Sequence, residues 1–467
     1  MSDYFERYKP LIHEWKAFQE AVQRPLPTTI WANPIKTTPD SLLKLLPNNL
    51  EAQPLPWLPG AFRLPPDFPS GLHWTYLAGL YHVQEEVSLL PITLLDPQLG
   101  ERTLDLCAAP GNKTAQISLA MRNSGSVIAN DRNIGRMRAT RHTLDRLGIY
   151  NVTTTVYDGG NFPRQAGPFD RVLVDAPCTC EGTCRKDNGI FANTGVNSQK
   201  LVGTQRALLR KAVQLCRPGG RIVYATCTFA PEENELVVDA ILREFGEKVQ
   251  MQPAAIPGFT ASPGVTHWQG QTLDESLHHA LRVWPHQNDT GGFFVAVLQK
   301  QPDTAAPETV EPPTFTSERE PWLSMIGDHY GIDSAQFEPY HLIRWSRKRL
   351  YLVNRNHQSV SRPQPDAVGM FFMHIDGKYP KWTTGAAQLF GRYATRQVVD
   401  LEPEQAQAYL ARQDCGLLAQ QTAVCNGTGY ALVRYQGIPL GVGVYRARQG
   451  LLESLFPKGW ARAGAIM

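Results

Sequence analysis

The chain has 467 residues, too many for a single hydrophobic core, so we expect roughly two to four domains. With 42% hydrophobic and 19% charged residues, and no apolar run long enough for a bilayer, the composition excludes a mini-protein and a membrane-spanning chain. The net charge of +3 does not indicate nucleic acid, so any basic surface must be local. No secretory signal opens the sequence, so we expect a cytoplasmic protein with eight reduced cysteines.

The first part of the chain is predicted to form a small N-terminal module over residues 1–93. Short helical patterns there are interrupted by two proline-rich patches, at 25–34 and 54–69. From about 94 to 300, strand-like runs alternate with amphipathic helical stretches, which predicts an α/β domain with a parallel sheet covered on both faces. The expected strands are Arg102–Leu106, Ser126–Asn130, Val152–Val156, Arg171–Asp175 and Arg221–Thr226.

The last third of the chain is predicted to be a separate unit. Residues 301–321 are rich in Pro, Thr and Glu and poor in large apolar residues, which predicts a linker. Residues 322–467 mix short strands with Gly turns, such as Ala431–Tyr435 and Leu440–Tyr445 around Gln436-Gly437. This pattern favours a compact α+β or mostly β region.

A loop of small residues follows the first expected strand and leads into a helix. It comprises Cys107, Ala108, Ala109, Pro110, Gly111, Asn112 and Lys113. Such a turn suits a nucleotide-like ligand, because helix-start amides face it, and Asp131, about 20 residues on, can accept from ribose hydroxyls. Neither the dinucleotide pattern nor the P-loop pattern is present, so we expect an adenosine-containing cofactor rather than a pyrophosphate. A tight turn without a ligand is the alternative.

Two cysteines stand just beyond two expected strands, in Asp175-Ala176-Pro177-Cys178 and Thr226-Cys227-Thr228. If these strands are parallel neighbours, both thiols lie at the carboxyl edge of the sheet beside the cofactor loop. A thiol there could attack a substrate, provided that its surroundings lower its pKa from roughly 8.5. The alternative is that each cysteine is a small buried hydrophobic residue.

Cys178, Cys180 and Cys184 form a dense run that raises the question of zinc. Their spacing lacks the two separated C-x-x-C pairs of a structural zinc site, and no His lies nearby to complete four ligands. We therefore expect no metal there.

Three motifs in this order, at 105–114, 175–178 and 226–228, resemble those of the RNA cytosine-5 methyltransferases of the NSUN and Sun-protein family. The segments 84–91 and 231–235 extend the resemblance across roughly 40–300. The stretches 438–441 and 455–460 are similar to the PUA-like region of the bacterial RsmF (YebU) branch. The resemblance implies a Rossmann-like class I S-adenosylmethionine methyltransferase fold, with a small N-terminal module and a C-terminal PUA-like region.

The resemblance also implies roles for individual residues. S-adenosylmethionine would be the cofactor, held by residues 107–113 together with Asp131 on the ribose, Asp158 near the adenine, and Asp175. Cys227 would be the nucleophile that adds to carbon 6 of cytosine, and Cys178 would assist removal of the carbon 5 proton and release of the adduct. Asp175 would bond the base edge. DNA cytosine methyltransferases use the other cysteine and follow it with Glu-Asn-Val, which does not follow Cys178 here.

The sequence departs from the family pattern beside the first cysteine, where Thr179-Cys180 replaces the usual Gly or Ser. The RNA partner needs positive charge for phosphates and apolar surfaces for displaced bases. The candidates are Arg185 and Lys186 near the active loop, and Arg347, Lys348 and Arg349 beside Trp345 and Tyr351. A solvated basic surface is the alternative for the second group.

The resulting prediction is an enzyme that forms 5-methylcytosine in small-subunit (16S) ribosomal RNA, with RNA or the 30S subunit as partner and no membrane. A transfer RNA cytosine-5 methyltransferase is the alternative with the same chemistry. A catalytically silent RNA-binding or ribosome-assembly factor is the alternative from another class. A protein or small-molecule methyltransferase is disfavoured, because direct methyl transfer needs no paired cysteines.

Overall fold

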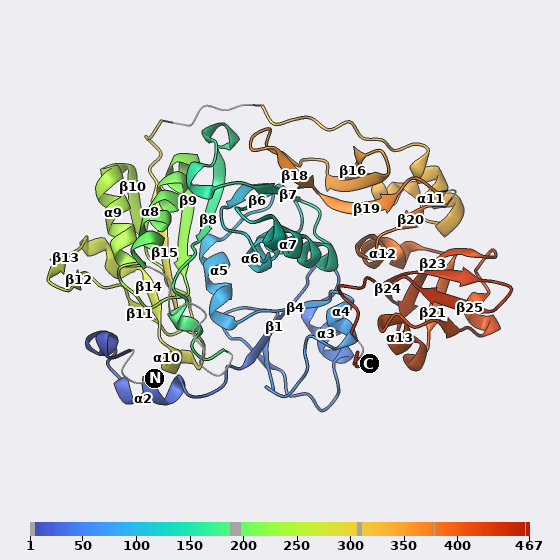
Figure 1. Ribbon diagram of the computed structural model, residues 1–467, viewed down its shortest axis with the longest axis horizontal. Helices are drawn as coiled ribbons and strands as arrows, with labels where there is room; N and C mark the ends of the chain where they lie inside the picture. The colour runs from blue at the N-terminus through green and yellow to red at the C-terminus, as the bar shows by residue number, and fades with distance from the viewer. Residues whose placement is uncertain (1–4, 187–197, 306–310, 378, 463) are drawn as a thin grey trace.

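The computed structural model describes residues 5–186, 198–305, 311–377, 379–462 and 464–467. Its centre is a ten-stranded sheet that contains five neighbouring parallel strands (Figure 1). In spatial order these are β9 (Cys216–Thr226), β8 (Phe169–Asp175), β5 (Arg102–Asp105), β6 (Ser126–Asp131) and β7 (Val152–Val156). The five expected strands and the parallel pairing of β8 with β9 are confirmed.

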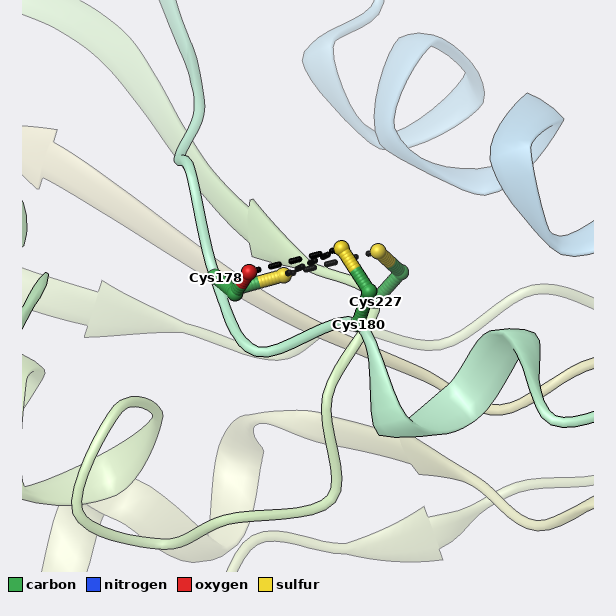
Figure 2. Close-up of side chains that lie close together, drawn as sticks. All are labelled: Cys178, Cys180 and Cys227. Atoms are coloured by element: carbon green, nitrogen blue, oxygen red, sulfur yellow. Dashed lines mark hydrogen bonds between the residues drawn. The ribbon is translucent and has the colours of Figure 1, made fainter. Parts of the chain in front are cut away.

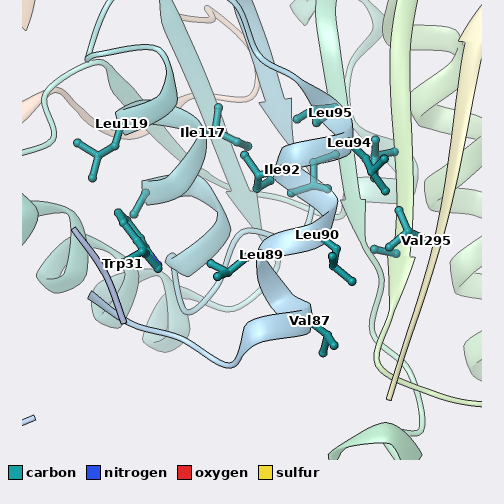
Figure 3. Packing of buried hydrophobic residues seen from close by; sticks show 14 of the residues in the cluster. Trp31, Val87, Leu89, Leu90, Ile92, Leu94, Leu95, Ile117, Leu119 and Val295 are labelled. Carbon is teal, nitrogen blue, oxygen red and sulfur yellow. The ribbon is translucent and has the colours of Figure 1, made fainter. Parts of the chain in front are cut away.

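The side chains of β8 alternate between two cores, because successive residues of a strand point to opposite faces. Leu173 packs with α5 (Leu90–Leu95), α6 (Asn112–Ala120) and α7 (Ile134–Leu147) in one core, part of which is shown in Figure 3. Val172 and Val174 pack with α8 (Ser198–Leu215) and α9 (Glu235–Phe245) in the other. The sheet is therefore covered on both faces, as predicted.

Antiparallel strands flank the parallel ones on both sides. Beyond β9 lies β15 (Phe293–Lys300), which pairs with β14 (Leu281–Val283) and β10 (Val249–Gln252), and β14 pairs with β11 (Ser262–Pro263). At the opposite edge β18 (Pro365–Val368) pairs with β7. A segment from the C-terminal part of the chain thus completes the central sheet, which the sequence analysis did not predict.

The N-terminal module is built on a four-stranded sheet in the order β2-β3-β1-β4. Its elements are α2 (Trp15–Ala21), β1 (Thr28–Ala32), α3 (Pro39–Leu45), β2 (Gln53–Pro54), β3 (Ala61–Leu64), α4 (Trp74–Leu77) and β4 (Tyr81–Val83). Lys36 joins it to the rest of the protein, since its Nζ donates to the Arg146 carbonyl at 2.7 Å and to Gln388 Oε1 at 2.8 Å.

Residues 322–467 contain two sheets. The first comprises β16 (Tyr340–Ser346), β17 (Arg349–Asn354), β19 (Met370–His374) and β20 (Lys381–Trp382); the second comprises β21 (Val398–Leu401), β23 (Gly429–Tyr435), β24 (Ile438–Arg446), β25 (Leu451–Ser454) and β22 (Cys415–Gly416). The helices are α11 (Trp322–Tyr330), α12 (Thr384–Phe390) and α13 (Pro403–Leu410). The expected hairpin around Gln436-Gly437 is confirmed as β23–β24.

The N-terminal and C-terminal parts share a hydrophobic core, in which the rings of Trp74 and Tyr435 meet edge to face at 5.0 Å. The described residues of the predicted linker, 301–305 and 311–321, contain no helix or strand, and residues 306–310 lie outside the described part. The domain boundaries themselves stay a prediction. In the described part of the chain, no helix is both long and apolar enough to cross a bilayer.

Candidate active site

A cavity of about 310 Å³ opens at the carboxyl ends of the parallel strands. Its lining residues are Leu106, Cys107, Ala109, Pro110, Asp131, Arg132, Arg136, Asp158, Gly159, Asp175, Ala176, Pro177, Cys178, Cys180, Thr204, Leu208 and Cys227. Residues that follow all five strands therefore meet in one place, because parallel strands end at the same edge. The expected meeting of loop, acids and cysteines is observed.

The cofactor loop contributes Cys107, Ala109 and Pro110 to this cavity, whereas Ala108, Gly111, Asn112 and Lys113 are not among its lining residues. Gly111 caps α6 with a φ of 101°, and a Cβ on it would lie 2.9 Å from Cγ2 of Thr140 in α7. Glycine is therefore required for the close approach of the loop to α7.

Asn112 is positioned from the N-terminal module rather than left free to face the cavity. Arg146 Nη2 donates to Nδ1 of His82 at 2.7 Å, so the ring proton is on Nε2, which donates to Asn112 Oδ1 at 3.0 Å. Burial, followed by the charge of Arg146, lowers the pKa of His82 to about 3. The ring is therefore neutral at physiological pH and links β4 to the start of α6.

Two carboxylates line the cavity beyond β6 and β7. Asp131 accepts from the Asn133 amide at 2.9 Å and lies 3.2 Å from Nη1 of Arg136. Asp158 is exposed and accepts from the Gly160 amide at 3.1 Å. Both side chains are held by local bonds at the places where the sequence predicted acceptors.

Asp175, at the end of β8, forms an ion pair with Lys113, whose Nζ lies 2.8 Å from Oδ2. Burial disfavours the charged form of Lys113, but the charges of Asp175, Cys227 and Asp105 outweigh it and raise the pKa of the ammonium. Asp105 is fully enclosed, and burial raises the pKa of its carboxyl to about 7 against the opposing bond from Thr114. In the described part of the protein its Oδ1 has no hydrogen-bond partner.

The sulfur atoms of Cys178, Cys180 and Cys227 gather in a single cluster (Figure 2). Cys178 follows β8 and Cys227 follows β9, and their Sγ atoms lie 3.4 Å apart. Cys180 Sγ lies 3.9 Å from Cys178 Sγ. Cys184 is instead buried among the aromatic residues Phe229 and Trp284. The predicted meeting of Cys178 and Cys227 is confirmed, and of the dense run in the sequence Cys180 joins them whereas Cys184 does not.

The three thiols interact so closely that they titrate together. Hydrogen bonds from Cys178, followed by those from Cys227, lower the pKa of Cys180 to about 3. The bonds to Cys180 and Cys227, together with burial, raise the pKa of Cys178. For Cys227, the bond from Cys178 lowers the pKa, but the bond to Cys180 and burial outweigh it and raise the pKa. One negative charge in the cluster therefore disfavours a second.

A clamp, here defined as Gln205, Glu233, Thr179 and Thr228, holds the turn that carries Cys178. Glu233 accepts from the Thr179 amide at 3.1 Å and from its hydroxyl at 2.6 Å. Gln205 Nε2 donates to Glu233 at 2.8 Å and to the Pro177 carbonyl at 2.9 Å, while the Thr179 and Thr228 hydroxyls lie 2.8 Å apart. The sequence analysis missed this clamp; its only signal was the 231–235 segment.

The expectation that Arg185 contacts RNA is wrong. Its side chain is 0% exposed, and its guanidinium donates to the carbonyls of Arg24, Pro25 and Thr290 and to Asp289 Oδ1, at distances of 2.8–2.9 Å. The group is thus fully used inside the protein. Lys186, the next residue, is exposed, so it stays a candidate for an RNA contact.

Arg347, Lys348 and Arg349 are exposed where β16 and β17 meet, away from the cavity lining. Lys348 lies 3.5 Å from Asp376, and the guanidinium carbon of Arg349 lies 5.2 Å from the centre of the Phe371 ring. These positions allow contact with a large partner, and the RNA-binding role stays a prediction.

The chain was compared with known proteins. Residues 92–299 match the family of the 16S rRNA methyltransferase RsmB/F, residues 2–86 match the N-terminal domain of 16S rRNA methyltransferase RsmF, and residues 396–462 match the methyltransferase RsmF PUA domain. A ribosomal RNA small subunit methyltransferase F from Aeromonas salmonicida (strain A449) is 31% identical over 446 residues, which cover 91% of this chain and 89% of the relative.

Two archaeal proteins match a smaller share of the chain. A tRNA (cytosine(49)-C(5))-methyltransferase from Pyrococcus abyssi is 36% identical and covers 63% of this chain and 94% of its own length. The crystal structure of a methyltransferase homolog protein from Pyrococcus horikoshii has a TM-score of 0.55 and 33% identity, covering 64% of this chain and 93% of that one. The near full-length match with the Aeromonas relative decides the assignment: the chain belongs to the RsmB/F family of 16S rRNA methyltransferases.

Proposed function

We propose that this enzyme transfers a methyl group from S-adenosylmethionine to carbon 5 of a cytosine in small-subunit ribosomal RNA. The observation that carries the proposal is the approach of two thiols, Cys178 and Cys227, to 3.4 Å at a cavity that also contains Asp175. Two cysteines at neighbouring strand ends suit covalent activation of a base. Direct transfer to a good nucleophile would need neither of them.

The cavity suits the proposed cofactor because of the groups that line it. Asp131 and Asp158 place carboxylate oxygens beyond β6 and β7, where hydroxyl and amine donors of an adenosine can bind, and Ala109 and Pro110 give an apolar wall. Residues 107–113 and Asp175 complete the proposed cofactor site. When bound, S-adenosylmethionine supplies an electrophilic methyl group.

Cys227 is the proposed nucleophile. Carbon 5 of cytosine is a poor nucleophile within the aromatic ring. Because its pKa is raised, the Cys227 thiol first gives its proton to solvent, and its sulfur then bonds carbon 6 and breaks that aromaticity. Carbon 5 then has enamine character and would form a bond to the methyl carbon as the methyl–sulfur bond breaks, with S-adenosylhomocysteine as the leaving group. Removal of the carbon 5 proton lets the S–C6 bond break, so that Cys227 leaves as a thiolate and the aromatic ring is restored.

Cys178 and Asp175 flank that reaction. Cys178 Sγ lies within hydrogen-bonding distance of Cys227 Sγ, so Cys178 is proposed to assist removal of the carbon 5 proton to solvent during release. Asp175 is the proposed partner of the base edge, and the ammonium of Lys113 keeps its carboxylate in one position. The clamp on Thr179 fixes the turn that carries Cys178.

The choice of ribosomal RNA over transfer RNA depends on the extent of the matches. The Aeromonas relative covers 91% of the chain, whereas the transfer RNA enzyme from Pyrococcus abyssi covers 63%. Residues 396–462 match a PUA domain model. Relatives that extend over this domain are therefore a better guide to the substrate than relatives that match a smaller share of the chain.

Methyl transfer from labelled S-adenosylmethionine to purified 30S subunits, to naked 16S ribosomal RNA and to total transfer RNA, followed by nucleoside analysis, tests the proposal. We expect 5-methylcytosine in the ribosomal RNA with the wild-type enzyme and none with Cys227→Ala. Label in transfer RNA alone would overturn the substrate choice. Label in neither RNA, with S-adenosylmethionine bound, would favour a silent assembly factor.

A further inference from the structure

Three thiols, rather than the two that the proposed reaction uses, lie at the cavity. The sulfurs of Cys178, Cys180 and Cys227 are all within 4.8 Å of one another, with measured separations of 3.4 Å between Cys178 and Cys227 and 3.9 Å between Cys178 and Cys180. Figure 2 shows the three side chains converging from two turns. The third thiol has no role in the methyl transfer proposed above.

These separations are close to those of sulfurs that share one metal ion. With Zn–S bonds of about 2.3 Å, two sulfurs lie about 3.8 Å apart in a tetrahedral site and about 4.0 Å apart in a trigonal one. Small side-chain rotations would bring 3.4 and 3.9 Å to these values. The three sulfurs are thus preorganised for a soft metal ion rather than spread around the cavity.

We propose that Cys178, Cys180 and Cys227 form a binding site for a soft metal ion of the zinc and cadmium class, and that metal occupancy there blocks methyl transfer by tying up Cys227. The three residues line the cavity, so a fourth coordination position faces its open space and can take water. Each thiol that is still protonated gives its proton to solvent as a metal–sulfur bond forms. Thiolate ligands exclude Mg²⁺ and Ca²⁺, which prefer oxygen.

The donor set explains why the sequence spacing pointed away from zinc. The run of Cys178, Cys180 and Cys184 does not match a metal motif, but the fold replaces Cys184 with Cys227 from the end of a neighbouring strand. Cys180 has a φ of 60°, which turns the chain back so that its sulfur approaches that of Cys178. Cys180 belongs to the Thr179-Cys180 pair, which replaces the Gly or Ser that is usual in the family that the sequence resembles.

The test is titration of the reduced, chelator-stripped full-length protein with Cd²⁺, followed by the ultraviolet charge-transfer absorption of Cd–thiolate bonds. We expect one strong equivalent per chain. Zn²⁺ competition against a chromophoric chelator gives the affinity, which Cys180→Ser and Cys180→Gly should each weaken by at least about tenfold, since even outer-shell changes cost roughly 10–100-fold. Glycine suits the positive φ, so it guards against misfolding of the serine variant.

Cys425→Ser is the matched control, because Cys425 is a half-buried thiol in the C-terminal region outside the cluster. It should bind Cd²⁺ as the wild type does. An absorption band that is unchanged in both Cys180 variants, or is lost in Cys425→Ser, would overturn the proposal. So would a wild-type protein that shows no thiolate band at stoichiometric Cd²⁺.

A second arm measures methyl transfer with added Zn²⁺. We expect inhibition of the wild type that a chelator reverses. Cys180→Ser, compared with its own metal-free rate, should need at least about tenfold more Zn²⁺ for half inhibition. Equal sensitivity of the two proteins would contradict the block at Cys227. Because the Cd²⁺ titration uses neither RNA nor S-adenosylmethionine, failure of the proposed methyl transfer and failure of the metal site are distinguishable.

Discussion

Glu233 is predicted to control the turn that carries Cys178 without touching the reacting atoms itself. The carboxylate is buried and accepts three hydrogen bonds, two from Thr179 and one from Gln205. Glu233→Ala would leave all three donors without their acceptor, and Glu233→Gln would keep the shape of the side chain. The two substitutions should therefore differ sharply in their effects.

The structure sets the size of that difference. A buried donor left unpaired costs about 1–3 kcal/mol, so loss of three bonds to one acceptor should lower the free energy of unfolding by at least about 3 kcal/mol in Glu233→Ala. In Glu233→Gln, the amide oxygen can take the position of Oε2, which accepts from the Thr179 amide and Gln205. The amide nitrogen then faces the Thr179 hydroxyl, which can accept, so only charge assistance is lost, at about 1 kcal/mol.

Urea unfolding gives the stabilities, and methyl transfer under saturating S-adenosylmethionine gives the rates. We expect the rate to fall in the same order, with Glu233→Ala lowest and Glu233→Gln close to wild type. Glu244→Ala is the control, because this exposed carboxylate forms an ion pair with Arg210, and its loss should cost less than about 1 kcal/mol. Equal stability of the Ala and Gln variants at position 233 would refute the reasoning.

Four further outcomes are expected. Arg185→Ala should lower the free energy of unfolding by about 3–5 kcal/mol, because its internal hydrogen bonds are lost. Its RNA affinity, measured by filter binding at a temperature below the Tm of the variant, should be unchanged. Weaker RNA binding with unchanged stability would contradict this. Because the pKa of the Asp105 carboxyl is raised to about 7, the wild-type Tm should fall as pH rises from about 4 to about 7. Asp105→Asn should remove this decrease of Tm with pH. Parallel Tm-against-pH curves for the two proteins would contradict the prediction. Lys348→Ala should reduce the slope of log affinity against log salt by about 1 if it contacts phosphate, and an unchanged slope would remove it from the interface. Cys178→Ala should accumulate a covalent RNA adduct that survives denaturing electrophoresis. If this variant methylates the RNA and no such adduct is found, the release role of Cys178 would be contradicted.

The parallel core could be predicted because each strand signal was local. Runs of β-branched residues such as Val152–Val156, and the motifs that follow the strands, indicated the order of the elements. The parallel register of β8 and β9 brings Cys178 and Cys227 together as predicted. The mixed character of the C-terminal region and the β23–β24 hairpin also followed from short-range turn chemistry.

The features that the sequence did not predict depend on contacts between distant parts of the chain. β18 pairs with β7 across more than two hundred residues, and no local pattern marks a strand of four residues as the edge of another domain's sheet. Arg185 looked like an exposed cation, but carbonyls of the N-terminal segment and of Thr290 enclose it. The approach of Cys180 to Cys178 depends on a positive φ at Cys180, which the sequence did not mark.

The central claim is that Cys227, rather than Cys178, attacks the cytosine. Ribosomal RNA that carries 5-fluorocytosine tests it directly, because carbon 5 then has no proton to lose after methylation and the covalent adduct persists. Wild-type enzyme would be incubated with this RNA and S-adenosylmethionine, digested, and analysed by mass spectrometry. The account predicts a methylated fluorocytosine on the peptide that contains Cys227, and none with Cys227→Ala. A modified peptide that contains Cys178 instead would contradict it.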